Sequence, residues 1–477
     1  MSKVNQFMLQ EKTSVINLVM PTLDPLLRIN SFSEIELGLT IDQAIEEANR
    51  CLHCKSASCI AGCPIRANIP EFIAALADGE ISHAAQILYC CNPFPSTCGR
   101  VCAQELQCEA RCILASTKAP IAIGSLERFV ADWALDNGVK IGPALRRAST
   151  GKNVAVIGSG PAGLTVAAQL ALMGHSVKIL EVLDESSSIL LLGIPEFRLP
   201  KRTVIAEMSR LLDLGVKIEC NVVSGKTVTM QELYKEYDAI FVGNGAASIV
   251  KPGIQGETLN GVYSAKEYLS RTNLTWLNQR TTGFSPLIQG RKVTVIGGGN
   301  TAIDCARVAR RLGGHQVRVI YPRSKAEMPA RTKEIMYAEE EGVELVTLSS
   351  PVRIIGDVEG RVTALIYQKM ELGDHNTSDR SQFHPVEGEL TRIDTDLVIY
   401  ALGTVAVPVV TEMLPVRECE KIVFYESGET EMSQIYMAGD NIRTNGTVIQ
   451  AIANGKRAAL AIHAYLDLKN RPNTCLI

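Results

Sequence analysis

The stretch VAVIGSGPAGLTVAAQLALMG, residues 154–174, decides the fold of this chain. Four consecutive apolar residues predict a buried strand, the glycines predict a tight turn, and the apolar run after them predicts a helix. Gly158 permits the turn, Gly160 lets a pyrophosphate approach the backbone, and Gly163 lets helix and strand pack closely. The helix N-terminus then stabilises phosphate charge. The expected nucleotide contacts are Gly158, Gly160, Pro161, Ala162 and Gly163.

An acidic residue ends the next strand. That strand covers residues 177–181, and Glu181 is placed to accept hydrogen bonds from a ribose. A glycine triplet alone would also fit a turn without a ligand. The order strand, turn, helix and acid favours a dinucleotide site.

A second turn of the same kind follows the apolar strand at residues 293–296. The strand after this turn ends in Arg323 and has no acid at the ribose position. An arginine there can pair with a 2′-phosphate, which favours NADP over NAD, and Arg331 is a second candidate. The alternative is that both arginines are ordinary surface charges. The expected contacts from the turn itself are Gly297, Gly299, Asn300, Thr301 and Ala302.

The chain returns to the first nucleotide domain near its end. A strand at 435–437 leads to Gly439 and Asp440, and a final helix begins at about Thr447. The glycines do not decide which turn takes which nucleotide. We expect this return to contact the rest of a long dinucleotide and to aim a helix N-terminus at a flavin ring. This favours FAD in the first domain and the nicotinamide nucleotide in the second.

Alternating strands and helices indicate mostly parallel sheets. The expected fold class is α/β, with an N-terminal α-helical, cysteine-rich domain followed by two Rossmann-like domains, the second inserted in the first. Thr40 is a predicted N-cap for a helix over 40–52, and further helices are predicted at 69–78, 81–89 and 123–135. The predicted segments are 1–145 (helical), 146–288 (FAD domain, first part), 289–402 (nicotinamide nucleotide domain) and 403–477 (FAD domain, C-terminal part).

Ten of the 14 cysteines lie in the first quarter of the chain. Four of them have the crowded spacing of a ferredoxin-type run that ends in Cys-Pro, in which the last cysteine serves a different cluster from the first three. Soft thiolates from short loops suit iron–sulfur clusters, whereas structural zinc usually shows two separated knuckles. The run is Cys51, Cys54, Cys59 and Cys63, and the second group is Cys98, Cys102, Cys108 and Cys112.

Composition excludes several other classes. Hydrophobic residues make up 46% and charged residues 21%, and the formal net charge is −3. No long basic run indicates binding to nucleic acid or to an anionic membrane. No stretch has the form of a secretory signal or of a membrane-spanning helix. We therefore expect a cytoplasmic protein with no nucleic-acid or membrane partner.

Together these motifs resemble the NADPH-dependent glutamate synthase small (β) subunit family. Relatives include the electron-input half of dihydropyrimidine dehydrogenase and the large subunit of the bifurcating NADH-dependent ferredoxin:NADP oxidoreductase. The stretch GIPEFRLPK, residues 193–201, also carries the resemblance, which implies cofactor contacts from Gly193 and Arg198. The remaining stretches are 51–64, 92–112, 158–164, 297–304 and 438–440.

The resemblance implies FAD and two [4Fe–4S] clusters. One cluster would take Cys51, Cys54, Cys59 and Cys112. The other would take Cys63, Cys102, Cys108 and a non-cysteine ligand. In the pyrimidine enzyme this ligand is a glutamine after an Ile-Gly-x-Leu turn. Here the turn at 123–126 is followed by Glu127, which we take as the ligand. The alternative is Cys98, with Glu127 a surface carboxylate.

The implied function is that of an NAD(P)H-dependent oxidoreductase. Electrons would pass from NADPH through FAD and the clusters to a partner, most simply a large subunit that makes glutamate from glutamine and 2-oxoglutarate. We expect an oligomer and name no catalytic acid or base, because hydride transfer needs none. The alternatives are electron input to a dihydropyrimidine dehydrogenase or to a bifurcating ferredoxin:NADP oxidoreductase, and, from another class, a zinc-stabilised redox-sensing interaction module.

Overall fold

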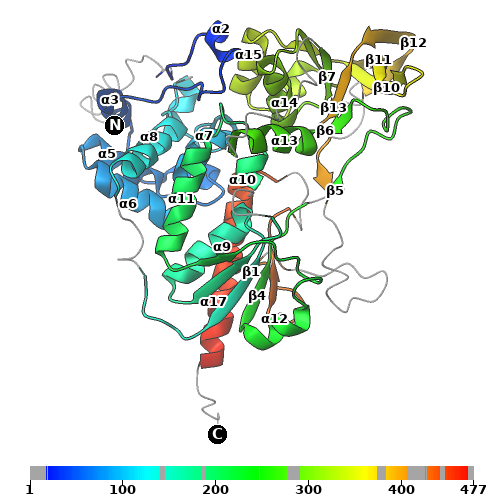
Figure 1. Ribbon diagram of the computed structural model, residues 1–477. Coiled ribbons are helices and arrows are strands. Elements are labelled where there is room, and N and C mark those ends of the chain that lie inside the picture. Colours follow the sequence, from blue (N-terminus) through cyan, green and yellow to red (C-terminus); the bar gives the residue numbers. More distant parts are fainter. Residues whose placement is uncertain are drawn as a thin grey trace.

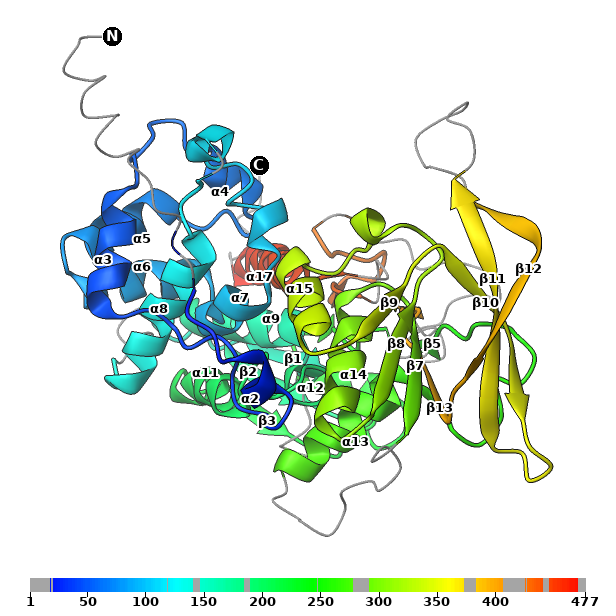
Figure 2. The ribbon, with the colours of Figure 1, turned by 90° about the horizontal axis from the view of Figure 1, so that it is seen from above.

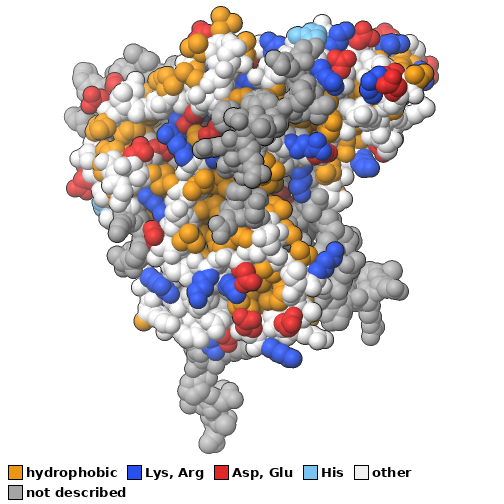
Figure 3. All heavy atoms as spheres, in the orientation of Figure 1, with side chains coloured by type: hydrophobic (Ala, Val, Ile, Leu, Met, Phe, Trp, Pro, Cys, Tyr) orange, Lys and Arg blue, Asp and Glu red, His pale blue; other side chains and the backbone are white. Residues whose placement is uncertain are grey.

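The computed structural model describes residues 18, 20–117, 119–139, 146–183, 189–246, 248–277, 291–372, 383–405, 425, 427–440 and 446–470. The chain forms three parts, a helical part followed by two sheet domains (Figure 1). This is the architecture that the sequence predicted. Within the described ranges, no helix combines the length and apolar character that crossing a bilayer requires. Figure 3 shows basic and acidic side chains interspersed over the described part of one face.

The N-terminal part is a set of short helices, and its cysteines lie partly within these helices and partly in the turns between them. Thr40 caps the second helix as predicted: its Oγ1 accepts a hydrogen bond from Gln43 N at 3.3 Å, and Gln43 Oε1 accepts one from Thr40 N at 2.9 Å. The predicted helices are confirmed to within three residues at their ends. The helices are α2 (Pro25–Arg28), α3 (Ile41–Asn49), α4 (Ser58–Gly62), α5 (Ile69–Ala77), α6 (Ile81–Cys91), α7 (Pro95–Val101), η1 (Gln104–Leu106), η2 (Ile113–Thr117) and α8 (Ile123–Asp136).

The first sheet is parallel, in the order β15-β4-β1-β2-β3. Its central strands are apolar and buried on both faces, as in doubly wound folds. The last strand joins from the far end of the sequence, so the domain is closed by the C-terminal return. The strands are β1 (Asn153–Ile157), β2 (Ser176–Leu180), β3 (Lys217–Glu219), β4 (Ala239–Val242) and β15 (Ile435–Met437), with helices α9 (Pro161–Leu172), α10 (Ile189–Leu192), α11 (Lys201–Asp213), α12 (Met230–Glu236) and α17 (Val448–Asn470).

The second sheet, also parallel, has the order β6-β13-β7-β8-β9. It lies between two segments of the first domain in the sequence, as the predicted insertion requires. Strand β6 precedes residue 289, where we placed the boundary, yet it pairs with β13. The elements are β6 (Val262–Ser264), α13 (Ala265–Leu277), β7 (Lys292–Ile296), α14 (Asn300–Arg311), β8 (Gln316–Ile320), η5 (Lys325–Glu327), α15 (Thr332–Glu340), β9 (Glu344–Val346) and β13 (Leu397–Tyr400).

A three-stranded antiparallel sheet was not predicted. It consists of β10 (Ser349–Gly356), β11 (Val362–Leu372) and β12 (Phe383–Asp394), and it projects from the second domain (Figure 2). Two short strands, β5 (Ser248–Ile249) and β14 (Thr404–Val405), pair antiparallel. Strand β5 follows β4 of the first sheet, and β14 follows β13 of the second sheet. The pair therefore joins the two chain segments that connect the sheet domains.

The helical part and the first sheet share one hydrophobic core. Phe72 and Leu126 from the helices belong to the same buried cluster as Val156 of β1 and Ile452 of α17. Helix α17 runs alongside α9 (Figure 1). The two helices approach so closely that a Cβ on Gly455 would lie 2.6 Å from the Ala162 carbonyl oxygen. Glycine is therefore needed in the middle of α17 despite its poor helix propensity.

We expect Gly455→Ala to lower the free energy of unfolding. Alanine gains about 1 kcal/mol in helix propensity. Crowding the Ala162 carbonyl costs about 1 to 3 kcal/mol, because backbone cannot swing aside as a flexible side chain can. With the cost near the middle of that range, the net loss should be about 1 kcal/mol by denaturant titration. The control is Leu460→Ala on the same helix, where the side chain is 57% exposed. A Gly455→Ala protein as stable as the parent would contradict this packing.

Candidate functional site

Three cysteines and a carboxylate line one cavity in the helical part. Cys63, Cys102, Cys108 and Glu127 all face it, and its other walls are mainly apolar. Cys63 follows α4, Cys102 ends α7, Cys108 follows η1, and Glu127 lies in the first turns of α8. Segments separated by more than 60 residues therefore bring three soft donors and one hard donor to a single space. That donor set and its apolar walls fit an iron–sulfur cluster.

The carboxylate of Glu127 faces this cavity and not the outer surface of α8. Asn92 Nδ2 donates a hydrogen bond to Glu127 Oε1 at 3.0 Å. Burial raises the pKa of Glu127 to about 8, the Asn92 bond opposes the shift, and repulsion from Glu207 adds to it. Cys98 is 0% exposed, and its thiol contacts Cys102 and Asn92. The reading of Glu127 as a surface carboxylate is therefore wrong, and its role as a ligand stays a prediction.

A second group of thiols lies around Cys59. Burial raises the pKa of the Cys59 thiol to about 11, and the nearby thiols of Cys112, Cys51 and Cys54 raise it further. Ser58 Oγ donates a hydrogen bond to the Arg111 carbonyl oxygen at 2.7 Å, which ties α4 to the loop that carries Cys112.

Cys63 lies with the residues that line the cavity, Cys102, Cys108 and Glu127. Burial raises the pKa of Cys63 to about 11, and its acidic neighbours are Glu127 and Cys98. Cys108 has Glu127 and Cys63 among the groups that raise its pKa. Cys63 therefore lies with Cys102, Cys108 and Glu127 around the cavity, with Cys98 also nearby, and the division of the cysteines between two clusters stays a prediction.

The first glycine turn has the geometry of a phosphate cradle. Gly158 has a φ of 97°, and a Cβ there would lie 2.6 Å from the Gly243 carbonyl oxygen. Gly160 is the N-cap of α9, and the nearest atom to a Cβ built there is 3.9 Å away. Glu181 closes the turn from β2, since its Oε2 accepts a hydrogen bond from Ser159 N at 2.7 Å. The space at Gly160 suits the backbone approach that a pyrophosphate needs.

The C-terminal return lies against the same turn. Gly439 has a φ of 91°, and a Cβ there would come within 3.3 Å of Ala162 Cβ. Burial raises the pKa of Asp440, and a hydrogen bond from the Gly446 backbone opposes the shift. Thr447 caps α17, accepting a hydrogen bond from Gln450 N at 3.3 Å. Gly439 therefore lies beside the first turn although it is more than 270 positions away in the sequence, and Asp440 and Thr447 lie between it and α17 along the chain.

Helix α17 also reaches the cysteine cavity. Ile449, in its first turn, lines the cavity of Cys63 and Glu127. Lys456 Nζ donates a hydrogen bond to the Cys91 carbonyl oxygen at 2.7 Å. One face of the helix contacts the first glycine turn, and its beginning forms a wall of the thiol cavity. The expected flavin site and the expected cluster site are therefore neighbours.

The second glycine turn repeats the cradle. Gly297 has a φ of 137°, and a Cβ there would lie 2.5 Å from the Ala401 carbonyl oxygen. Gly299 is the N-cap of α14, and a Cβ built on it would have no atom within 4 Å. Thr301 is exposed and Ala302 is buried in the first turn of α14. Arg323 follows β8 half-buried, with its guanidinium 6.0 Å from the centre of the Phe383 ring.

Arg331 does not lie where we expected it. Its side chain is 3% exposed, and its guanidinium donates to the Arg100 carbonyl oxygen at 2.8 Å, to Gln104 Oε1 at 2.7 Å and to Glu105 at 3.3 Å. These bonds occupy the donors that a 2′-phosphate would need. In this structure Arg331 joins the second sheet domain to the helical part.

Arg198 is likewise engaged in a domain contact. Its Nη1 pairs with Asp304 of α14 at 2.6 Å, and its Nε lies 3.8 Å from Glu334 of α15. The neighbouring loop at Gly193 is held from α13, where Asn273 Nδ2 donates to the carbonyl oxygens of residues 192 and 194 at 2.7 and 3.1 Å. The GIPEFRLPK stretch thus connects the two sheet domains, and a direct cofactor contact from Arg198 stays a prediction.

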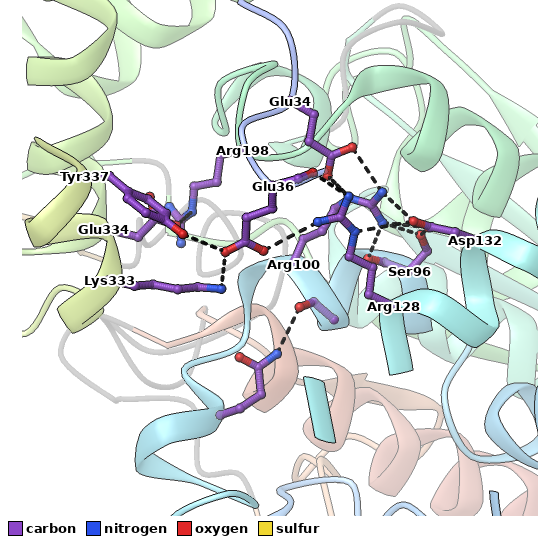
Figure 4. Close-up of polar contacts among 12 residues, drawn as sticks. Glu34, Glu36, Ser96, Arg100, Arg128, Asp132, Arg198, Lys333, Glu334 and Tyr337 are labelled. Carbon is purple, nitrogen blue, oxygen red and sulfur yellow. Dashed lines mark hydrogen bonds and ion pairs between the residues drawn. The ribbon is translucent and has the colours of Figure 1, made fainter. Parts of the chain in front are cut away.

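The segment before α3 bridges the helical part and the second sheet domain. Glu34 Oε1 accepts from Arg100 at 2.6 Å and pairs with Arg128 at 2.9 Å. Glu36 pairs with Arg128 at 3.5 Å on one side and with Lys333 of α15 on the other (Figure 4). Sequence analysis missed these carboxylates, as it missed Asn92, Gln104 and Asn273. Their role depends on partners far away in the sequence, and no local pattern marks it.

Comparisons with known proteins agree with these three parts. Residues 28–139 match the family described as dihydropyrimidine dehydrogenase domain II, 4Fe-4S cluster, and residues 152–458 match the pyridine nucleotide-disulphide oxidoreductase family. The first match favours iron–sulfur clusters over the zinc alternative.

Two curated relatives and one solved structure are similar to the chain. The glutamate synthase [NADPH] small chain of Azospirillum brasilense is 33% identical over 451 residues, 93% of each chain. The NADP(+)-dependent formate dehydrogenase subunit beta of Moorella thermoacetica is 33% identical over 86% of this chain and 60% of its own length. Mycobacterium tuberculosis FprA in complex with NADPH shares the fold, with a TM-score of 0.56 and 20% identity over 68% of this chain and 85% of its own.

We expect Glu127→Ala to change one cluster and leave the other as it is. Removing the oxygen donor should alter the electron paramagnetic resonance spectrum of one reduced cluster, because ligand identity tunes the cluster. The comparison variant is Cys98→Ala, which removes a buried thiol that contacts Cys102 but is not itself a proposed ligand, so it should change the spectrum of that cluster less than Glu127→Ala does. If Cys98→Ala changes a spectrum and Glu127→Ala does not, Cys98 is the fourth ligand.

Proposed function

The chain belongs to the NADPH-dependent glutamate synthase small chain family, and on that premise we propose that it is an electron-input subunit. It would take electrons from NADPH and deliver them, by way of FAD and two [4Fe–4S] clusters, to a separate acceptor protein. The observation that carries the proposal is the position of α17, which contacts the first glycine turn at Ala162 and lines the thiol cavity with Ile449.

The first sheet domain supports the proposal with a site for FAD. The flavin supplies hydride acceptance and one-electron release when it is bound. The Gly158–Gly163 turn and the N-terminus of α9 would hold the pyrophosphate. The Glu181 carboxylate, which already accepts a hydrogen bond from Ser159 N, would accept another from a ribose hydroxyl. Thr447 would orient the start of α17 toward the flavin ring, where the positive end of the helix dipole stabilises negative charge.

The helical part would hold the clusters. Cys51, Cys54, Cys59 and Cys112 would bind one cluster, and Cys63, Cys102, Cys108 and Glu127 the other. Raised thiol pKa values in this part have burial as a cause, since a thiolate in apolar surroundings needs a compensating charge. Iron supplies that charge, which is why metal binding and folding are coupled in such domains.

The second sheet domain would bind NADPH. The open space at Gly299 supports close approach of a pyrophosphate to the N-terminus of α14. Of the two arginines that the sequence offered for the 2′-phosphate, Arg331 is engaged elsewhere, which leaves Arg323. Its guanidinium would pair with the phosphate in a charge-assisted bond.

The acceptor would be a large glutamate synthase subunit. The support is the similarity to small chains over 93% of both sequences. The formate dehydrogenase relative indicates that this electron-input unit also serves other partners. Electron input is common to both candidate acceptors.

The cofactor content of the protein and its reduction by NADPH test electron input directly. Anaerobically purified protein should contain FAD and about eight iron and eight acid-labile sulfide per chain, the content of two [4Fe–4S] clusters. NADPH should bleach both the flavin and the cluster absorbance. A native pull-down should recover a large amidotransferase-type chain. Protein that holds zinc but neither iron nor sulfide would overturn the electron-input proposal, whereas a different large chain would overturn only the choice of acceptor.

Arg323 should determine the preference for NADPH over NADH. Arg323→Ala should raise the KM for NADPH at least tenfold, because a charge-assisted bond of about 1.5 to 3 kcal/mol is lost. The KM for NADH, which has no 2′-phosphate, should change little. Arg318→Ala, on the strand just before it, is the matched control, since Arg318 pairs with Glu344 at 2.6 Å. Equal effects of Arg323→Ala on the two nucleotides would defeat the assignment.

A further inference from the structure

Arg331 stands between the second glycine turn and the cysteine part. It immediately precedes α15 in the second sheet domain, yet its guanidinium is buried against the helical part. It donates to the Arg100 carbonyl oxygen at 2.8 Å and to Gln104 Oε1 at 2.7 Å, and it pairs with Glu105 at 3.3 Å. A buried guanidinium with partners on both α7 and η1 holds the second sheet domain against the helical part.

The backbone at Arg331 is joined to the turn expected to hold NADPH. Arg331 N donates to Asn300 Oδ1 at 3.0 Å, and Ala330 N donates to the Gly298 carbonyl oxygen at 3.2 Å. Asn300 is the first residue of α14, directly after Gly299. A shift of this turn upon nucleotide binding would therefore move the backbone of Arg331.

Gln104 carries the contact on to the thiol cavity. Its Nε2 donates to the carbonyl oxygens of Cys98 at 3.2 Å and Gly99 at 3.1 Å, and its side chain lines the cavity with Cys102 and Glu127. Gly124 leaves room for it, because a Cβ at Gly124 would collide with the Gln104 side chain. With its oxygen held by Arg331 and its nitrogen held by two carbonyls, the amide has one orientation.

We propose that Arg331, acting through Gln104, is a positioning residue that couples nucleotide binding at the Gly297–Ala302 turn to the redox potential of the cluster in the Cys63–Glu127 cavity. This inference rests on the proposed function, since it needs both ligands. Groups that hydrogen-bond around the ligands of a metal site tune the metal, and Gln104 occupies such a place. Because coupling between sites is reciprocal, reduction of that cluster would also change nucleotide affinity.

The sign of the effect follows from charge. Glu105 pairs with Arg331, and Glu109 accepts a hydrogen bond from Gly124 N at 3.0 Å in the same wall. Without the guanidinium these carboxylates lose a nearby positive charge. A cluster gains negative charge upon reduction, so a more negative surrounding disfavours the reduced form. Loss of Arg331 should therefore lower the potential of this cluster, and the cluster around Cys59 should be affected less.

The test is an anaerobic redox titration of the full-length holoprotein, followed by electron paramagnetic resonance. Both clusters are titrated with and without 2′,5′-ADP, the fragment of NADP that carries the 2′-phosphate and takes no electrons. Arg331→Met removes charge and hydrogen bonds, whereas Arg331→Lys keeps the charge but not the forked contact to Arg100 and Gln104. Arg361→Met is the control, because Arg361 is an exposed residue paired with Asp357 and Glu359 on the antiparallel sheet.

In the parent protein and in Arg361→Met, 2′,5′-ADP should shift the potential of one cluster. Arg331→Met should lower that potential and abolish the shift. Arg331→Lys should abolish the shift with a smaller change in the cluster potential. If Arg331→Met does not fold, Arg331→Lys is the test variant. The inference is overturned if Arg331 variants with full iron, sulfide and FAD keep the parent potentials and the response to 2′,5′-ADP. Absence of iron and sulfide from the parent protein would instead reject the proposed function.

Discussion

Charges buried in the second sheet domain must be neutralised where they lie, and this requirement draws in a side chain of the first sheet domain. Arg307 of α14 is 0% exposed and pairs with Glu334 and with Glu341 at 2.8 Å, and Arg311 pairs with Glu341 at 2.6 Å. Arg198 extends this set into the GIPEFRLPK stretch. Leaving one such charge without its partner costs about 3 to 5 kcal/mol. The domains therefore have one mutual position, and electron transfer between bound groups depends on fixed positions.

The fixed arrangement of the domains keeps α17 in contact with both expected cofactor sites. This helix comes from the end of the chain, yet it contacts the first glycine turn through Gly455 and the thiol cavity through Ile449. Because the helical part and the first sheet share one core, neither the turn nor the cavity moves independently of the helix. The insertion of the second domain is what allows the last strand and α17 to close the first domain from the far end of the sequence.

Local patterns predicted the parts of this protein that depend on local physics. The strand, glycine turn and helix at each nucleotide site, the Thr40 cap and the spacing of the cysteines follow from backbone geometry and ligand chemistry within a few residues. The sequence could not tell that Arg331 and Arg198 are taken up by domain contacts, because an arginine's partners are set by tertiary structure. The antiparallel sheet was missed since β12 is exposed along most of its length and carries no apolar alternation.

The position of the Glu127 cavity beside α17 indicates the order in which electrons would pass. Cys102 and Cys108 are each 7% exposed, and their cavity adjoins α17 and therefore the FAD domain. The four cysteines of the other group are half-buried, as is Cys63, and Ile113, which directly follows Cys112, is 59% exposed. Exposed large apolar side chains beside a redox group suit contact with another protein. On the proposed function, electrons would pass from the first glycine turn through the Glu127 cavity to the group around Cys59.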